Sequence, residues 1–220
     1  MLGPIHKTLT LKQIKSKLKS HEKWLAGESG GKQAVFSNRK LEGLSLKGAN
    51  LNRANFDHSV LINVDLSGAL LNKACCHETK FYNVNFSNAS CFDIDLYCAE
   101  LFDCILSYTY MTFANLTRAS LKNCAVCSID LTSANLSQTD LRGTGILRIV
   151  TDYEVTICPG KNGPILHYGC ERHPISYWKK NIKKIVEDKE IWLDLREQRI
   201  KEIKTIIALY SAQVKTIGRI

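Results

Sequence analysis

Residues 49–71 read ANLNRANFDHSVLINVDLSGALL, and an apolar side chain recurs in this stretch at every fifth position. The recurring large residues are Leu51, Phe56, Leu61, Leu66 and Leu71. A period of five matches neither an α-helix, with 3.6 residues per turn, nor a flat strand, with a period of two. It is typical of a chain that turns a corner after every five residues and repeats as a solenoid.

The same period continues on both sides without a break, from Phe36 to Ile146. Two residues before each large residue the side chain is usually small, as at Ala49 and Ala54, and Asn or Asp often stands between the two. The large residue would fill the axis of a narrow tube, and the small one would leave room for the opposite wall. Asn and Asp can hydrogen-bond to nearby backbone at the corners. The pattern therefore predicts an all-β solenoid over residues 36–146.

This A-(N/D)-L-x-x repeat, which recurs at 49–51, 114–116 and 134–136, resembles the pentapeptide repeat family. The resemblance implies a right-handed quadrilateral β-helix, in which four pentapeptides form one coil and residues 20 apart stack. The segments HisGluLysTrpLeu (21–25) and GlyCysGluArgHis (169–173), with Trp178, are similar to phage- and prophage-encoded members. This second similarity implies a shared architecture, with an N-terminal helix and a C-terminal helical region.

The charge of the chain lies outside the repeats. The formal net charge is +9, yet residues 36–146 contain nine Lys or Arg against ten Asp or Glu, whereas residues 1–35 and 147–220 carry +5 each. Some pentapeptide repeat proteins are acidic rods that mimic duplex DNA and bind type II topoisomerases, and some of these confer quinolone resistance. Because the repeat region of this chain is nearly neutral, the sequence disfavours that activity.

Composition indicates a cytoplasmic protein. No run of 18 apolar residues could span a bilayer, and no apolar segment follows the N-terminal lysines as a signal peptide would require. The nine cysteines have no fixed spacing. Cys76 and Cys91 fall at core positions, and Cys104 and Cys124 at the small inward position, which favours free, buried thiols.

Apolar side chains also occur at positions that point outward. One group, one coil apart in the predicted stacking, is Ile62, Tyr82 and Phe102; a second, on another side of the coil and near Leu70, is Phe92, Tyr110 and Phe113. Contiguous exposed apolar surface usually marks an interaction site. The sequence predicts that these residues bind a partner or a second copy, unless another segment of the chain covers them.

Residues 1–35 are expected to form a capping helix (10–25), with Thr10 and Gln13 as a capping box, and a loop.

Residues 147–220 are expected to form short strands, including a hairpin of 153–157 with 165–168, followed by helices near 175–187 and 189–216. The last helix has apolar residues at heptad positions: Leu193, Ile200, Ile203, Ile207, Tyr210 and Val214, with a break at Arg196. This pattern suits a partner helix, and in parts of the family a C-terminal element joins two rods into a dimer. The alternative is that the helix caps its own final coil.

One constellation in the C-terminal region could carry chemistry. Cys158, His167, Cys170 and His173 are all possible zinc ligands. Their order is unusual, because it contains neither a C-x-x-C pair nor the two histidines of a Cys2His2 finger. The basic run Lys179–Lys184 has no aromatic platform among its lysines, so nucleic-acid binding is not expected.

The sequence thus predicts a non-enzymatic scaffold that acts by protein–protein interaction, without catalytic residues or a cofactor. The alternatives are a DNA-mimic modulator of a type II topoisomerase, a bacterial effector that docks on a host or cellular target, and a zinc-dependent activity of the C-terminal region.

Overall fold

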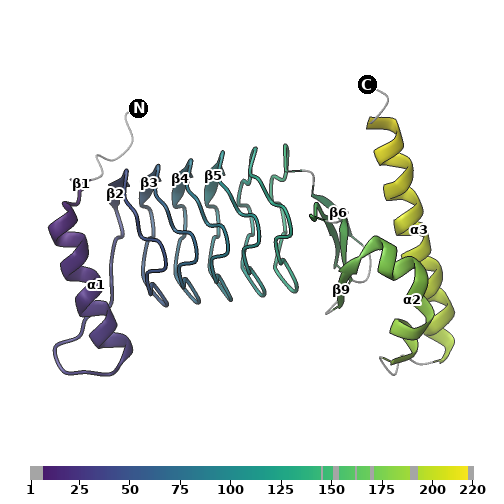
Figure 1. The fold of residues 1–220 in the computed structure, drawn as a ribbon, viewed down its shortest axis with the longest axis horizontal. Helices are drawn as coiled ribbons and strands as arrows, with labels where there is room; N and C mark the ends of the chain where they lie inside the picture. Colours follow the sequence, from purple (N-terminus) through teal and green to yellow (C-terminus); the bar gives the residue numbers. More distant parts are fainter. Residues whose placement is uncertain are drawn as a thin grey trace.

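The computed structural model describes residues 7–144, 146–150, 154–161, 163–168, 171–188 and 193–217. Its centre is a row of stacked coils with helices at both ends (Figure 1). Helix α1 (Leu11–Leu25) lies at the N-terminal end. Helices α2 (Ile175–Asp188) and α3 (Leu193–Ile217) lie at the C-terminal end.

The coils form a four-sided parallel β-helix. One side is a parallel sheet of β1 (Lys7–Thr8), β2 (Arg39–Glu42), β3 (Val60–Ile62), β4 (Lys80–Tyr82) and β5 (Glu100–Phe102), in that order. Leu41 pairs with Leu61, and Leu61 with Phe81, so the register advances by one coil of 20 residues. The other sides are held by single parallel bridges with the same offset, such as Asn55 with Cys75. The predicted five-residue period and stacking are confirmed.

The corners explain the local sequence. The second residue after each core position adopts a positive φ, as at Asn63 (53°) and Asn83 (53°). Such left-handed conformations favour Gly, Asn and Asp. The Asn or Asp before the core residue supports the turn, because the backbone N–H of Asp57 donates to Oδ1 of Asn55 at 2.9 Å.

Large apolar side chains fill the axis of the rod. The rings of Phe36 and Phe56 stack at 4.9 Å between centroids. The small residues that alternate with them, such as Ala34 and Ala54, are completely buried. The four cysteines predicted to point inward are also buried: Cys76, Cys91, Cys104 and Cys124. They behave as small core residues.

Helix α1 closes the first coil. The capping box is present, since the backbone N–H of Gln13 donates to Oγ1 of Thr10 and that of Thr10 donates to Oε1 of Gln13. Ile14 is buried in the core of the rod. The backbone N–H of Ala34 donates to Nδ1 of the buried His21 at 3.0 Å. The helix thereby covers the edge of the solenoid, which would otherwise be open to strand pairing.

A four-stranded antiparallel sheet follows the last coil. It contains β6 (Leu147–Val150), β7 (Glu154–Cys158), β8 (Ile165–Tyr168) and β9 (Glu171–Pro174), in that order. The predicted hairpin of the second and third strands is confirmed, whereas β9 was not predicted. The sheet contacts the rod directly, because the N–H of Ser128 donates to the carbonyl of Pro159 at 2.7 Å. Arg172 Nη2 also donates to the carbonyl of Ser128 at 3.0 Å.

Helices α2 and α3 pack on the other face of this sheet. Val155, Ile157 and Leu166 form a second core with Trp178, and Trp178 Nε1 donates to the carbonyl of Leu166 at 3.1 Å. None of the helices in the described ranges is long and apolar enough to cross a bilayer.

The predicted heptad seam of α3 faces this second core. Ile203 and Ile207 are buried in it, and Ile200 and Tyr210 are half-buried against it. The side chains of Leu193 and Val214 lie outside the described residues. The heptad pattern therefore corresponds to packing within one chain at Ile203 and Ile207, because α2 and the sheet supply the apolar partners that the sequence assigned to a second helix.

Candidate protein interaction surfaces

The first predicted apolar group forms a ladder on the sheet side of the rod. Ile62 pairs with Tyr82, and Tyr82 with Phe102, on adjacent parallel strands. Ile62 and Tyr82 are half-buried and Phe102 is 36% exposed, so the C-terminal region does not bury this ladder. The predicted alignment is confirmed, although the role of these residues in partner binding stays a prediction.

Charged groups surround the ladder. Lys80 Nζ lies 3.0 Å from Glu100 Oε1, and Lys122 Nζ lies 5.8 Å from the centre of the Phe102 ring. The Tyr82 hydroxyl donates to Glu100 Oε2 at 3.5 Å. The ladder is therefore a narrow apolar strip whose edges are already paired within the chain.

The second predicted group is more exposed. Tyr110 is 56% exposed, Phe113 54% and Phe92 42%. The rings of Phe92 and Phe113 meet edge to face, with centroids 5.5 Å apart. Leu70 lies in the same column as Tyr110, but Ser90 pairs between them, so this column is interrupted. The structure thus brings Phe92 and Phe113 together, with Tyr110 on the same side of the rod.

Within the stretch 102–113, the sequence analysis missed two exposed apolar residues. Ile105 is 41% exposed and Tyr108 40%. Tyr108 occupies the corner that leads to the side of Tyr110, two residues later. The sequence contains the information needed to find Tyr108. Tyr108 is the second residue after the core residue Leu106, and the second residue after each core residue lies at a corner of the coil. We call Phe92, Tyr108, Tyr110 and Phe113 the aromatic patch.

The backbone at two of these residues is unfavourable for an aromatic side chain. Tyr108 has φ 60° and Phe113 has φ 61°. A bulky residue in the left-handed region costs on the order of 1–3 kcal/mol, and most of the neighbouring corners carry small or polar residues. Among the corners that the structure describes, Tyr108 and Phe113 are the ones that carry Tyr or Phe. The left-handed conformation itself does not favour these side chains.

The charges on the rod form local pairs of opposite sign. Besides Lys80 and Glu100, Lys40 Nζ lies 2.6 Å from Glu42 Oε2 and Arg142 Nη2 lies 2.7 Å from Asp140 Oδ2. His77 Nε2 lies 2.6 Å from Asp95 Oδ2, and this hydrogen bond raises the pKa of His77. Duplex DNA carries a dense array of uniform negative charge. The described surface of the rod does not reproduce it.

The predicted zinc constellation is divided between two faces of the C-terminal sheet. Thr156 pairs with His167 and His167 with Arg172, on the face that contacts the rod. Cys158 lies on this same face and joins the core of the rod. His173 pairs with Leu166 on the opposite face, where its Nε2 lies 2.8 Å from Glu171 Oε2.

The prediction that Cys158, His167, Cys170 and His173 could ligate one zinc ion is therefore wrong for the three that are described, and Cys170 lies outside the described residues. Neighbouring residues of a strand point to opposite faces, and the unpredicted strand β9 sends His173 away from His167. Among the described residues, no three His, Cys, Asp or Glu side chains are grouped to hold a metal ion.

The comparisons agree with this geometry. The model of the family "Pentapeptide repeats" matches eight copies, over residues 32–68, 49–88, 94–132 and 110–144. The chain belongs to the pentapeptide repeat family. No curated protein matches this pentapeptide repeat protein significantly.

Several solved structures are similar to it. A pentapeptide repeat protein (Rfr23) from the cyanobacterium Cyanothece 51142 is 23% identical with a TM-score of 0.41, and the match covers 59% of this chain and 92% of that one. HetL, a protein involved in heterocyst differentiation regulation from Nostoc sp. strain PCC 7120, is 18% identical with a TM-score of 0.33, covering 60% and 72%. QnrB1, a plasmid-mediated fluoroquinolone resistance protein, is 17% identical with a TM-score of 0.36, covering 51% and 67%. These values give no support for a shared partner.

Proposed function

We propose that this pentapeptide repeat protein is a non-enzymatic scaffold that binds a protein partner through the aromatic patch. The observation that carries the proposal is the pair of exposed aromatic residues, Tyr108 and Phe113, at left-handed corners. Natural sequences tolerate such local strain where function requires it. Aromatic side chains are enriched at the centres of protein interfaces.

One ring contact of the patch is formed before any partner binds. Phe92 and Phe113 already contact each other, so burying them against a partner requires little loss of side-chain freedom. Tyr108 and Tyr110 are exposed as well and each adds a hydroxyl group. Residues 95–114 make one coil, because Asp95 pairs with Asn115, and this coil carries three of the four aromatic residues. The rigid backbone of the solenoid holds them at fixed spacing.

A double variant at the two corners tests this proposal. Tyr108→Asn with Phe113→Asn replaces both corner residues by a type that accepts a positive φ. The wild type and the variant, each immobilised, are used to capture proteins from a bacterial lysate, and the captured proteins are quantified by mass spectrometry. We expect at least one protein to be enriched on the wild type and lost on the double variant.

The matched control is Tyr177→Ser, which removes an aromatic residue that is 44% exposed on α2, away from the rod. This control should retain the same captured protein. The proposal is wrong if the double variant, with an unchanged circular dichroism spectrum, captures the same proteins as the wild type. The identity of the captured protein decides between a cellular target, a topoisomerase and, with a host lysate, the target of an effector.

The homodimer through α3 is a separate proposal with a narrower basis. Ile203 and Ile207 are buried within the chain, which leaves Ile200, Tyr210 and the end of α3 for a second copy. Figure 1 shows the C-terminal half of α3 extending beyond α2. Light scattering on the full chain tests it: a solution mass of twice 24.8 kDa would support the dimer, and a mass of 24.8 kDa would refute it.

A further inference from the structure

Helix α1 and the segment that leads from it into the first coil form a cleft. Its volume is about 500 Å³, and it is lined by Ser16, Lys17, Ser20, Lys32, Gln33 and Val35. The first three of these residues come from α1, and the other three come from the segment that follows it. Cavities of about 300–1,000 Å³ are the size that small molecules occupy. The cleft therefore has room for a small ligand between two elements.

The lining of the cleft is positively charged. Lys17 is half-buried and Lys32 is exposed, and neither forms an ion pair with another residue in the part of the chain that the structure describes. Glu22 and Glu28 are the acidic residues of the first 35, and neither of them lines the cleft. Two cations from different segments thus meet here without a counter-ion from the described residues, which favours a negatively charged ligand.

Hydrogen-bond donors accompany the two cations. Oγ of Ser20 accepts the backbone N–H of Lys32 at 3.1 Å, so its own proton is left to donate, and no described residue accepts that proton. The hydroxyl of Ser16 has no described partner either. Nε2 of Gln33 donates one of its two protons to the carbonyl of Arg53 at 2.5 Å. Ammonium groups combined with hydroxyl donors are the groups that bind phosphate or sulfate oxygens.

The glycine-rich loop after α1 does not supply the donors itself. The backbone N–H groups of Gly27, Glu28 and Gly31 all donate to carbonyls of α1 or of the loop. In a phosphate loop, successive backbone N–H groups point at the ligand instead. Side chains of the cleft would therefore hold the anion.

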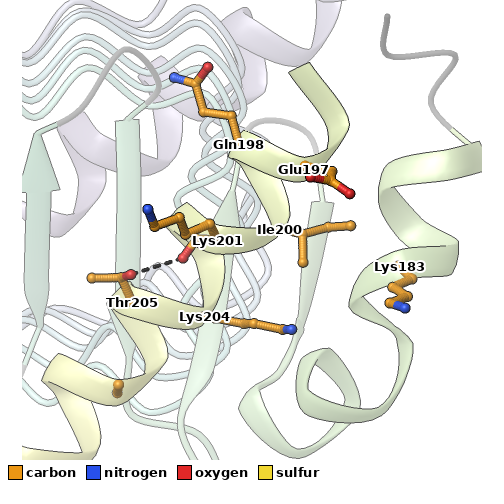
Figure 2. Close-up of a pocket in the computed structure, with 8 residues that line it drawn as sticks. Lys183, Glu197, Gln198, Ile200, Lys201, Lys204 and Thr205 are labelled. Atoms are coloured by element: carbon orange, nitrogen blue, oxygen red, sulfur yellow. Dashed lines mark hydrogen bonds between the residues drawn. The ribbon is translucent and has the colours of Figure 1, made fainter. Parts of the chain in front are cut away.

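We propose that this cleft binds a small molecule that carries a phosphate or a similar oxyanion group, at a site separate from the aromatic patch. Val35, which is 41% exposed, offers an apolar contact to the rest of the ligand. The groove between α2 and α3 is larger, at about 800 Å³, and also contains lysines (Figure 2). Its lining includes Glu197, however, and this carboxylate would repel an anion.

Titration of the full chain with sodium pyrophosphate, followed by ¹H–¹⁵N NMR spectroscopy, tests the proposal. Pyrophosphate should shift the amide signals of residues 16–20 and 32–35, because these residues form the cleft. The shifts should saturate below about 10 mM pyrophosphate. Sodium chloride at the same ionic strength should not produce saturable shifts, since it only screens the lysines.

Two charge-matched variants locate the site. Lys17→Gln with Lys32→Gln removes both cations of the cleft and should weaken pyrophosphate binding at least about fivefold. Lys15→Gln with Lys19→Gln makes the same change in net charge at exposed positions of α1 that do not line the cleft. This control should change the affinity less than about twofold.

Vesicles distinguish two sources of the phosphate once pyrophosphate binding is established. Phosphatidylcholine vesicles with about 20% phosphatidic acid are mixed with the full chain and sedimented. Sedimentation with the vesicles that the cleft variant loses would support the proposal with a lipid headgroup as the ligand. No sedimentation would support it with a soluble molecule.

Three results would overturn the proposal. If the pyrophosphate shifts do not saturate, the cleft is not a binding site. If the control variant weakens binding as much as the cleft variant, only the net charge matters. If a DNA duplex of about 20 base pairs displaces pyrophosphate and the cleft variant no longer binds that duplex, the cleft is part of a nucleic-acid surface.

Discussion

His21 and Ala34 connect the N-terminal helix to the first coil, because Nδ1 of His21 accepts the backbone N–H of Ala34 at 3.0 Å. His21 is completely buried and stacks on Trp24 with ring centroids 5.4 Å apart. Since Nδ1 accepts a hydrogen bond, it cannot also carry the proton of a charged ring. Burial lowers the pKa of His21 below its ordinary value of 6.5.

Replacing His21 should therefore change both stability and its pH dependence. His21→Phe keeps a ring but leaves the N–H of Ala34 without its acceptor, which should cost about 1–3 kcal/mol of unfolding free energy at neutral pH. Because the pKa of His21 is lower in the folded chain, the unfolded chain takes up this proton at a higher pH than the folded chain does, so this histidine reduces stability as the pH falls below about 6.5. Urea unfolding at about pH 7.5 and 5.5 should show a smaller loss in the variant. An identical loss in both proteins would contradict this account.

A second buried histidine lies where the C-terminal sheet meets the rod. His167 is 3% exposed, and neither ring nitrogen has a hydrogen-bond partner among the described residues. Burial, with a contribution from Arg172, lowers the pKa of His167 to about 4. The shift from 6.5 corresponds to about 3 kcal/mol of stability, which is present above pH 6.5 and is lost as the pH falls toward about 4.

His167→Leu should remove this loss, because Leu needs no hydrogen bond and takes up no proton. We expect the unfolding free energy near pH 7 to change by less than about 1.5 kcal/mol and its fall toward pH 4 to become shallower. The exposed His58, 3.5 Å from Glu78 Oε2, provides the control. If His58→Leu flattens the pH profile as much as His167→Leu, the effect does not come from burial.

The sequence predicted the rod well because one side-chain pattern determines it. The large residue at every fifth position and the small residue two before it are enough to place Ile62, Tyr82 and Phe102 in one ladder, since coils of equal length have a fixed register. The corner at Tyr108 could have been found by the same counting. An aromatic residue in a left-handed turn contradicts local preference, so turn propensity alone gives no reason to expect one at this position.

The C-terminal region has no repeat of this kind, and its contacts depend on strand register. His173 could not be placed on the face opposite His167 until β9 was known, so the unusual spacing of the four possible ligands disfavoured a zinc site but did not exclude it. The heptad pattern of α3 corresponds to residues that are buried, but a heptad pattern does not indicate which apolar surface packs against them. Here α2 and the sheet bury Ile203 and Ile207.

Exchanging Asn and Tyr between two equivalent corners tests the backbone strain at Tyr108. Asn88 and Tyr108 occupy the same column, one coil apart, with φ 59° and 60°. Tyr108→Asn should raise the unfolding free energy by about 0.5–1 kcal/mol, because Asn tolerates the left-handed conformation. Asn88→Tyr should lower it by a similar amount. Thermal unfolding of both variants checks this, and a destabilised Tyr108→Asn would show that Tyr108 supports the fold.

Cavities in the axis of the rod should be costly. Leu96 is completely buried at the centre of the solenoid. Leu96→Ala should lower the unfolding free energy by about 2–5 kcal/mol, because the neighbouring coils cannot collapse into the space. Val35, which is 41% exposed, is the control, and Val35→Ala should change stability by less than about 0.5 kcal/mol. Equal effects at both positions, measured in urea, would contradict a close-packed axis.

The thiols should react in two groups if the solenoid packs as described. Cys76, Cys91, Cys104, Cys124 and Cys158 are buried, whereas Cys75, Cys98 and Cys127 are half-exposed. Burial raises the pKa of Cys76 and that of Cys91, and raises that of Cys158 to about 12, so few thiolates form at these sites.

Brief treatment of the folded protein with iodoacetamide, followed by peptide mass spectrometry, should label the half-exposed group first. Cys75 should be the slowest of these three, because burial and the carboxylates of Asp57 and Asp95 raise its pKa. Treatment in urea should label both groups at similar rates, which controls for peptide recovery. Rapid labelling of Cys104 or Cys124 in the folded protein would mean that the coils open there, since a thiol inside the axis can meet the reagent only when neighbouring coils separate.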